Sequence, residues 1–299
     1  MALAGNAAAA PSAADPPTAQ TAHGGAVRIQ AGKPTRVPTV APPQGARPAK
    51  EEPKAAAAAP NAAYRQYTVW YGPVTIQPNE WWTAWVSCPS GMVATGGGES
   101  NTSAGGVVLH NTAALDDGSG WQVTVTTDGA TSATFKVFAV CFSGLNAYLH
   151  MSDKALVGAG SGTTLVTNCP TTVYQLLGGG GSSDTLNTGI NASPIAGTRS
   201  WVFGMSNYDS AAHTANSQAV CGMGVNNYQA VNGPENTLAP GQIGSSFVSC
   251  PPGTWIVGGG GFGGGILTDS YPDGQGWRAY ILNNTPYTGY AAARAICGN

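Results

Sequence analysis

The chain has 299 residues, a formal net charge of −2, and only 9% charged residues. It is long enough for one large or two ordinary domains, and its charge balance argues against a nucleic-acid partner. No run of about 18 apolar residues occurs, so the sequence predicts no transmembrane segment.

Residues 1–63 differ in composition from the rest of the chain. They are rich in Ala and Pro, and they hold six basic and three acidic residues. Such a segment cannot bury enough apolar surface to offset the entropy lost on ordering. We therefore expect a disordered tail or linker over 1–63 and a folded domain over 64–299. Ala2-Leu3-Ala4 resembles the cleavage end of a signal peptide whose earlier parts are absent, which favours secretion.

Three features recur in the folded part at fixed spacing. A cysteine followed by proline returns every 81 residues (169−88 and 250−169), and each framework tryptophan precedes a second cysteine by 20 residues (141−121, 221−201, 297−277). The residues concerned are Cys88, Cys169 and Cys250; Trp121, Trp201 and Trp277; and Cys141, Cys221 and Cys297. This spacing predicts three internal repeats, which we call units one (64–143), two (144–224) and three (225–299).

Each unit is expected to contain the same strands in the same order. A short apolar strand ends in the first cysteine, and a second strand ends in a glycine run at 96–98, 178–181 or 258–261. Glycine inside a strand indicates a bulge or the close approach of another backbone. The third strand starts at the tryptophan and alternates apolar with polar residues, so Trp121, Trp201 and Trp277 are predicted to lie in the core.

The six cysteines fall into three equivalent pairs, one in each unit. No C-x-x-C motif and no histidine at metal-ligand spacing accompanies them. We therefore expect three disulfides within the units, Cys88 with Cys141, Cys169 with Cys221 and Cys250 with Cys297. Disulfides indicate an oxidising compartment, so the protein is expected to be secreted or extracellular.

The fold is expected to be all-β, because long 3.6-residue periodicity is missing and the chain holds 43 Gly and 21 Pro. Three units of four or five strands favour a β-prism-like, pseudo-threefold arrangement. Tandem small β-sandwiches and a β-trefoil remain as alternatives, although no Pro-rich linker separates the units.

The stretch from Trp85 through Cys88-Pro89 to Gly96 resembles a motif of the vitelline membrane outer layer protein family. Cys250-Pro251-Pro252-Gly253 through Gly258 resembles it more loosely, whereas unit two departs from it with Thr171-Thr172. The resemblance implies three repeats, a β-prism fold and a secreted, non-catalytic protein associated with matrix or glycan. It transfers no site residue to this chain.

Motifs of catalysis are absent from the sequence. There is no G-x-S-x-G and no H-E-x-x-H, and His110, His150 and His213 fall at unmatched positions in the three units. The Asp-Gly turns at 117–118 and 273–274, together with Asp116 or Asp269, could ligate calcium, but a hairpin turn explains them without a metal. We therefore expect no enzyme, no cofactor and no metal site.

Unit one carries an excess of aromatic residues, which makes them the candidate binding residues: Trp70, Tyr71, Trp81, Trp82 and Trp85. The stretches taken as their counterparts, 160–164 and 242–246, are small or polar, whereas a core position should be apolar in all three units. The sequence thus predicts a contact surface for a glycan or a cell-surface component, or else a cover for the tail. The alternative function is a structural or attachment component of an envelope, matrix or virion, and the oligomeric state is left open.

Overall fold

The computed structural model describes residues 66–101, 106–127 and 131–299. These residues form strands and no helix, so the all-β expectation is confirmed. In the described part of the chain there is accordingly no helix that could cross a membrane. The tail predicted over 1–63 lies outside the described residues.

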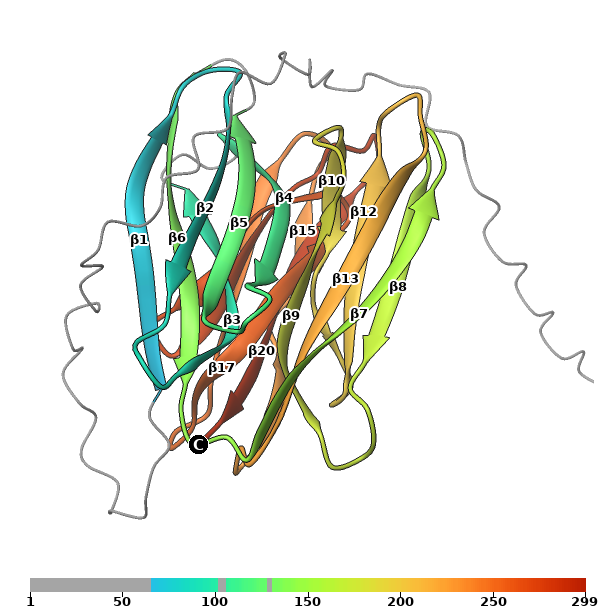
Figure 1. Cartoon of the computed structure of the whole chain (residues 1–299). Coiled ribbons are helices and arrows are strands. Elements are labelled where there is room, and N and C mark those ends of the chain that lie inside the picture. Colours follow the sequence, from blue (N-terminus) through green and yellow to red (C-terminus); the bar gives the residue numbers. More distant parts are fainter. Residues whose placement is uncertain (1–65, 102–105, 128–130) are drawn as a thin grey trace, which may run out of the picture.

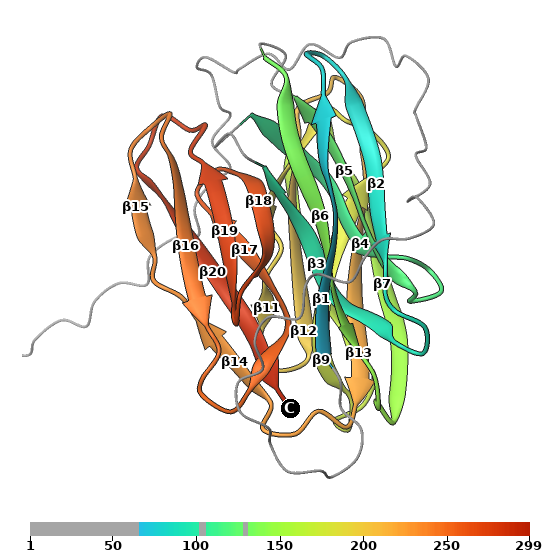
Figure 2. The ribbon, with the colours of Figure 1, turned by 90° about the vertical axis from the view of Figure 1, so that its left-hand side faces the viewer.

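The strands form three open sheets, which we call A, B and C. Figures 1 and 2 show them from two directions. Sheet A runs in the order β1 (Gln66–Ile76), β6 (Ala133–Phe142), β3 (Val93–Asn101), β18 (Ile266–Asp273), β19 (Gly276–Leu282) and β16 (Ile243–Ser249). Sheet B runs in the order β2 (Trp81–Ser87), β5 (Gly120–Thr127), β4 (Val107–Ala114), β9 (Gln175–Ser183), β13 (His213–Met223) and β7 (Ala147–Val157).

Sheet C has eight strands. Its main path is β11 (Ile195–Ala196), β12 (Ser200–Asn207), β10 (Thr188–Ala192), β17 (Trp255–Gly263), β20 (Gly289–Gly298) and β14 (Gln229–Asn232). Beside this path, β15 (Asn236–Leu238) pairs with β20, and β8 (Gly162–Asn168) pairs with β12.

Every sheet combines strands of two predicted units. Sheet A joins units one and three, sheet B joins units two and one, and sheet C joins units three and two. The backbone pairing between the units is short, with the single pair Ser270 and Glu99 in sheet A and the single pair Ala192 and Phe262 in sheet C. No predicted unit therefore has a sheet to itself, and side chains must contribute to the contacts between units.

The three disulfides have the expected partners and link the sheets to one another. Cys88–Cys141 joins the end of β2 in sheet B to β6 in sheet A, and the other two bonds join sheet C to B and sheet A to C. The loops they close span 53, 52 and 47 residues. In the chain-entropy model each such bond stabilises the fold by about 4 kcal/mol.

The glycine runs pack directly against the framework tryptophans. Trp121, Trp201 and Trp277 are fully buried. A Cβ added at Gly97 would collide with the ring of Trp121, and Gly179 and Gly259 stand in the same relation to the other two rings. The preceding glycines, at 96, 178 and 258, meet one another's backbones where the three units come together. The glycine positions therefore mark close approaches, and a register shift at the start of each run shows that both features the sequence indicated, a bulge and a close approach, are present.

Candidate functional site

The aromatic residues of β2 lie on two different faces of sheet B. Trp82 packs against the core and shares its side of the strand with the buried Ala84 and Val86. Trp81 and Trp85 are at the alternate positions and therefore lie on the outer face. Trp85 is opposite Gln122 and Trp81 is opposite Thr126 on β5.

The two candidates on β1 separate in the same way, because they too are adjacent in the sequence. Tyr71 packs against the core, whereas the side chain of Trp70 is 37% exposed on the outer face of sheet A. The Nζ atom of Lys136 lies 4.8 Å from the centre of the Trp70 ring. The five predicted binding residues thus do not form one surface: two face the core, two lie outside sheet B and one lies outside sheet A.

The counterparts of the β2 aromatic residues also need correction. Pairing with the tryptophan strand places Val166 and Phe247 at the position of Trp85. Both are exposed, at 49% and 36%. The stretches 160–164 and 242–246 were therefore one or two residues out of register; the 81-residue spacing of the first cysteines leads to the same two residues as the strand pairing. This outward position is therefore apolar in all three units, and the excess in unit one is smaller than it first appeared.

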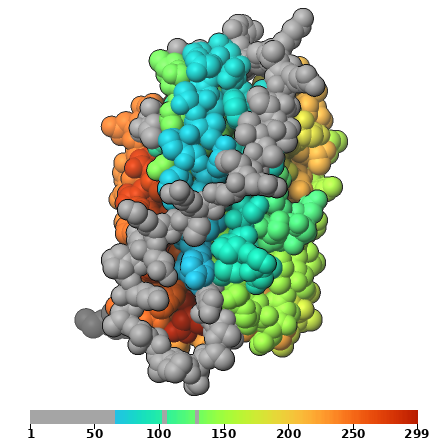
Figure 3. Space-filling view, turned by 60° about the vertical axis from the view of Figure 1, so that its left-hand side comes forward, coloured from blue at the N-terminus to red at the C-terminus, as the bar shows by residue number. Residues whose placement is uncertain are grey.

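A line of large side chains crosses the outer face of sheet A, and we call it the aromatic row. It consists of Trp70 on β1, Phe138 on β6, Tyr271 on β18, Arg278 on β19 and Phe247 on β16. Register pairs run along it from Trp70 to Phe138, from Tyr271 to Arg278 and from Arg278 to Phe247. Figure 3 shows unit one (cyan) and unit three (orange to red) next to each other on this side of the molecule.

Contacts between its members hold the aromatic row in place. The Phe138 and Tyr271 rings are stacked, with centres 5.5 Å apart and planes inclined by 23°. The guanidinium of Arg278 lies 4.8 Å from the centre of the Phe247 ring, and its Nε donates to Asp273 Oδ2 at 2.7 Å. Burial, followed by the nearby Tyr280 and Asp273, raises the pKa of Tyr271, so its hydroxyl stays neutral. The row therefore combines four aromatic rings, each with a neighbouring side chain against one face, and the hydrogen-bonded pair of Arg278 and Asp273.

Phe138 reaches unit three by passing over a glycine. It is paired with Gly98, where an added Cβ would collide with the carbonyl oxygen of Ser270. Residues 218 and 294 are the equivalents of Phe138 in units two and three, because each lies three positions before the second cysteine of its unit. Their side chains also contact a neighbouring unit. Gln218 Oε1 accepts from the Ala114 N–H at 2.8 Å, and an Arg294 nitrogen donates to the Ile195 carbonyl at 2.7 Å. Sequence reasoning missed these residues, although their shared distance from the cysteine is visible in the sequence.

Two of the three histidines in the described part of the chain lie in structural surroundings. His110 is buried, and burial lowers its pKa to about 4, so the ring is neutral. Its Nε2 lies 2.9 Å from Thr126 Oγ1. His150 Nε2 lies 2.7 Å from the hydroxyl of Tyr148, which itself donates to the Ala94 carbonyl. Burial also lowers the pKa of His150.

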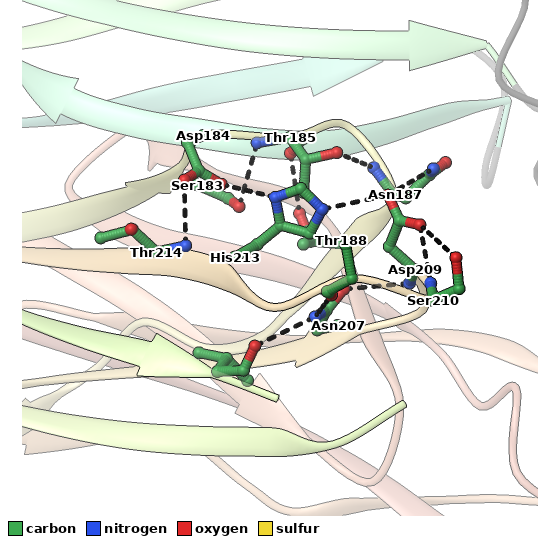
Figure 4. A network of polar contacts seen from close by, with 12 residues as sticks. Ser183, Asp184, Thr185, Asn187, Thr188, Asn207, Asp209, Ser210, His213 and Thr214 are labelled. Carbon is green, nitrogen blue, oxygen red and sulfur yellow. Dashed lines mark hydrogen bonds and ion pairs between the residues drawn. The ribbon is translucent and has the colours of Figure 1, made fainter. Parts of the chain in front are cut away.

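His213 lies between two carboxylates in the polar network of Figure 4. Its Nδ1 is 2.9 Å from Asp184 Oδ1 and its Nε2 is 3.0 Å from Asp209 Oδ2. A carboxylate only accepts hydrogen bonds, so both contacts are hydrogen bonds only when the ring carries two protons. The network fastens the β9–β10 and β12–β13 loops together.

The Asp-Gly turns are held by donors of the chain itself. Asp117 Oδ1 accepts from the Ser119 N–H at 2.9 Å, and Asp273 accepts from Arg278. Within residues 66–101, 106–127 and 131–299, no group of three or more His, Cys, Asp or Glu side chains is arranged to hold a metal ion.

The aromatic row is thus the candidate functional site. Its geometry suits recognition of a flat or elongated partner. In comparison with known proteins, the chain matches no family model, and no curated protein matches it.

Proposed function

We propose that this protein is a secreted, non-catalytic binding protein that recognises a neutral, linear glycan through the aromatic row of sheet A. The observation that carries the proposal is the row itself, which presents Trp70, Phe138, Tyr271 and Phe247 on one face across strands from two units.

A glycan matches this surface in shape and in chemistry. Aromatic faces stack on the apolar faces of sugar rings, and the polar tips beside them bind hydroxyl groups. The row crosses six strands, which corresponds to about 24 Å at the usual strand spacing. Its charges are few and partly paired, because Arg278 is bound to Asp273. A neutral polymer therefore suits the surface better than a strongly anionic one.

The architecture and the compartment belong to the same proposal. We propose that the three units are copies arranged as a β-prism about a pseudo-threefold axis, as in the vitelline membrane outer layer protein family. Support comes from the strand layout shared by the three sheets and from the glycines that meet between the units. The three disulfides support secretion, because such bonds persist in oxidising compartments.

A glycan array followed by calorimetric titration tests the function. The array should contain linear neutral oligosaccharides, such as cellohexaose and chitohexaose, together with sulfated ones. Trp70→Ala and Phe247→Ala should each weaken binding about tenfold, which corresponds to about 1.4 kcal/mol for one lost stacking contact. Trp85→Ala is the matched control, because it removes an outward aromatic residue from sheet B and should leave the affinity unchanged.

Two outcomes would contradict the proposal. If Trp85→Ala abolished binding and Trp70→Ala did not, the site would lie on sheet B. If no glycan bound and the protein were found in fixed proportion with an envelope or particle, the structural alternative would hold instead.

A further inference from the structure

Glu99 is a carboxylic acid in an unusual place. It lies on β3, is fully buried, and neither of its carboxyl oxygens has a hydrogen-bond partner among the described residues. The corresponding positions on β9 and β17 are Gly181 and Gly261, which the pairing with the last strand of each unit identifies. The strand arrangement common to the three units therefore does not require a carboxyl group at this position.

A second buried carboxyl group lies at the same junction. Asp269 on β18 is 2% exposed, and its two oxygens accept from the Asn101 N–H at 2.6 Å and from Asn101 Nδ2 at 2.9 Å. Glu99 itself is paired with Ser270, the single register pair between β3 and β18. The neighbouring residues, Gly98 and Tyr271, belong to the line of the aromatic row. Both residues therefore lie where units one and three meet, next to Gly98 and Tyr271 along their strands. Glu99 is on the inner face of sheet A with its register partners Val137 and Ser270, whereas the row lies on the outer face.

The surroundings oppose a second negative charge at this junction. Burial raises the pKa of Glu99 well above its usual value, and the charge of Asp269 raises it further. Burial also raises the pKa of Asp269, to about 7, against the hydrogen bonds from Asn101 and Thr268, which lower it. Asp269 accepts hydrogen bonds, whereas Glu99 accepts none from the described residues, so Asp269 ionises first as the pH rises and Glu99 keeps its proton longer.

Among the described residues, the other ionisable groups on β18 and on the strands that pack against β3 and β18 do not form an ion pair with Glu99 or Asp269. They are Tyr271 and Asp273 on β18, Arg278 and Tyr280 on β19, Lys136 on β6, His110 on β4 and His213 on β13. Arg278 is bound to Asp273, His213 is bound to two other carboxylates, and His110 is neutral. Lys136 lies over the Trp70 ring on the outer face.

We infer that Glu99 and Asp269 make the junction between β3 and β18 proton-dependent: it is tight while the pair keeps a proton and loosens when both carboxyls are charged. The aromatic row crosses this junction, so glycan binding should weaken in the loosened state. This regulation rests on the proposed function of the row.

The direction of the pH effect follows from the two states of the chain. In the unfolded chain both carboxyls ionise near pH 4, whereas in the folded protein they hold protons to higher pH. Stability from this junction is therefore complete below about pH 4 and is lost as the pH rises, first through about 7, where Asp269 ionises, and then through the raised pKa of Glu99. The effect is opposite in sign to that of ordinary surface carboxylates.

Glu99→Gln in the full-length chain tests the inference, because glutamine has nearly the same shape and no charge at any pH. Between pH 5 and pH 8.5 the wild-type Tm should fall relative to that of the variant by about 5 °C. Over the same range the affinity for cellohexaose and chitohexaose should fall about tenfold in the wild type and less than twofold in the variant. Asp153→Asn on β7, an exposed carboxylate of sheet B, is the control and should behave as the wild type.

Equal pH profiles for the wild type and Glu99→Gln would overturn the inference. If the variant did not fold, hydrogen exchange of the wild type would decide: corrected protection of β3 and β18 should fall above pH 7 relative to β9 and β13, and unchanged protection would refute a loosening junction. If the junction responded to pH but neither oligosaccharide bound at any pH, the proposed function would fail while the proton-dependent junction stood.

Discussion

The outer faces of sheets A and B share one backbone layout and differ in chemistry. Along the aromatic row, sheet A presents Trp70, Phe138, Tyr271, Arg278 and Phe247, and the same places in sheet B hold Ser152, Gln218, Ala113, Gln122 and Trp85. Both lines cross a glycine between two units, Gly98 in sheet A and Gly180 in sheet B. The strand arrangement thus fixes the positions of the outward side chains, and the residue type at each position determines what the face can bind.

The ionisable groups of the two sheets differ in the same manner. Sheet A buries Glu99 and Asp269 without a cationic partner, whereas in sheet B the carboxylates next to β13 are partly exposed and bound to His213. One arrangement loses stability with rising pH and the other with falling pH. Substitutions in the shared frame should therefore affect both sheets alike, while substitutions on the faces should separate them.

The largest effect is expected from the framework tryptophans. Trp277→Ala in sheet A and Trp121→Ala in sheet B should each lower the free energy of unfolding by about 3 to 5 kcal/mol, because each removes a fully buried ring. Urea denaturation measures both. A difference of more than about 2 kcal/mol between the two losses would mean that the framework tryptophans of sheets A and B are not packed in the same way.

A somewhat smaller loss is expected at the glycines between the units. A Cβ at Gly98 would collide with the Ser270 carbonyl and a Cβ at Gly180 with the Thr112 carbonyl. Because backbone cannot yield as a side chain can, Gly98→Ala and Gly180→Ala should each cost about 3 kcal/mol. Thermal unfolding would show it, and a tolerated alanine at either site would refute the close approach there.

The adjacent tryptophans of β2 should respond unequally. Trp82→Ala removes a ring packed against the core and should cost about 2 kcal/mol, whereas Trp81→Ala acts on the outer face and should cost about 0.5 kcal/mol. Denaturation of the two variants under identical conditions makes the comparison. Equal losses would show that the outer face of sheet B is itself a packed interface.

The smallest effect is expected on thermal stability at acidic pH. Burial acts to raise the pKa of Asp184, but hydrogen bonds from Thr214 and His213 outweigh it and hold that pKa below its usual value. Hydrogen bonds from Asn187, Ser210 and His213 lower the pKa of Asp209. Stability from both is present above about pH 4 and is lost as the pH falls. The Tm of Asp209→Asn should therefore fall less than that of the wild type between pH 5 and pH 3.

Much of the frame could be predicted because it depends on local spacing. The all-β class followed from strand alternation and glycine content, and the disulfide partners followed from the equal placement of the cysteines in each unit. The opposite orientation of Trp81 and Trp82 follows from the period of two along a strand. The glycine runs were predicted to be bulges or close approaches, although the groups they approach, the framework rings and the neighbouring units, were not predicted.

The candidate site could not be predicted in the same way. The sequence by itself determined which adjacent aromatic residues lie on opposite faces of a strand, because successive side chains of a strand alternate between its two faces. Only the tertiary structure decided that Trp70 and Phe138 share a face with Tyr271 and Phe247, and that Glu99 is paired with Ser270, the residue after Asp269. These neighbours come from units far apart in the chain, and their register is set by backbone pairing and glycine contacts between units, which leave no periodic trace within either strand.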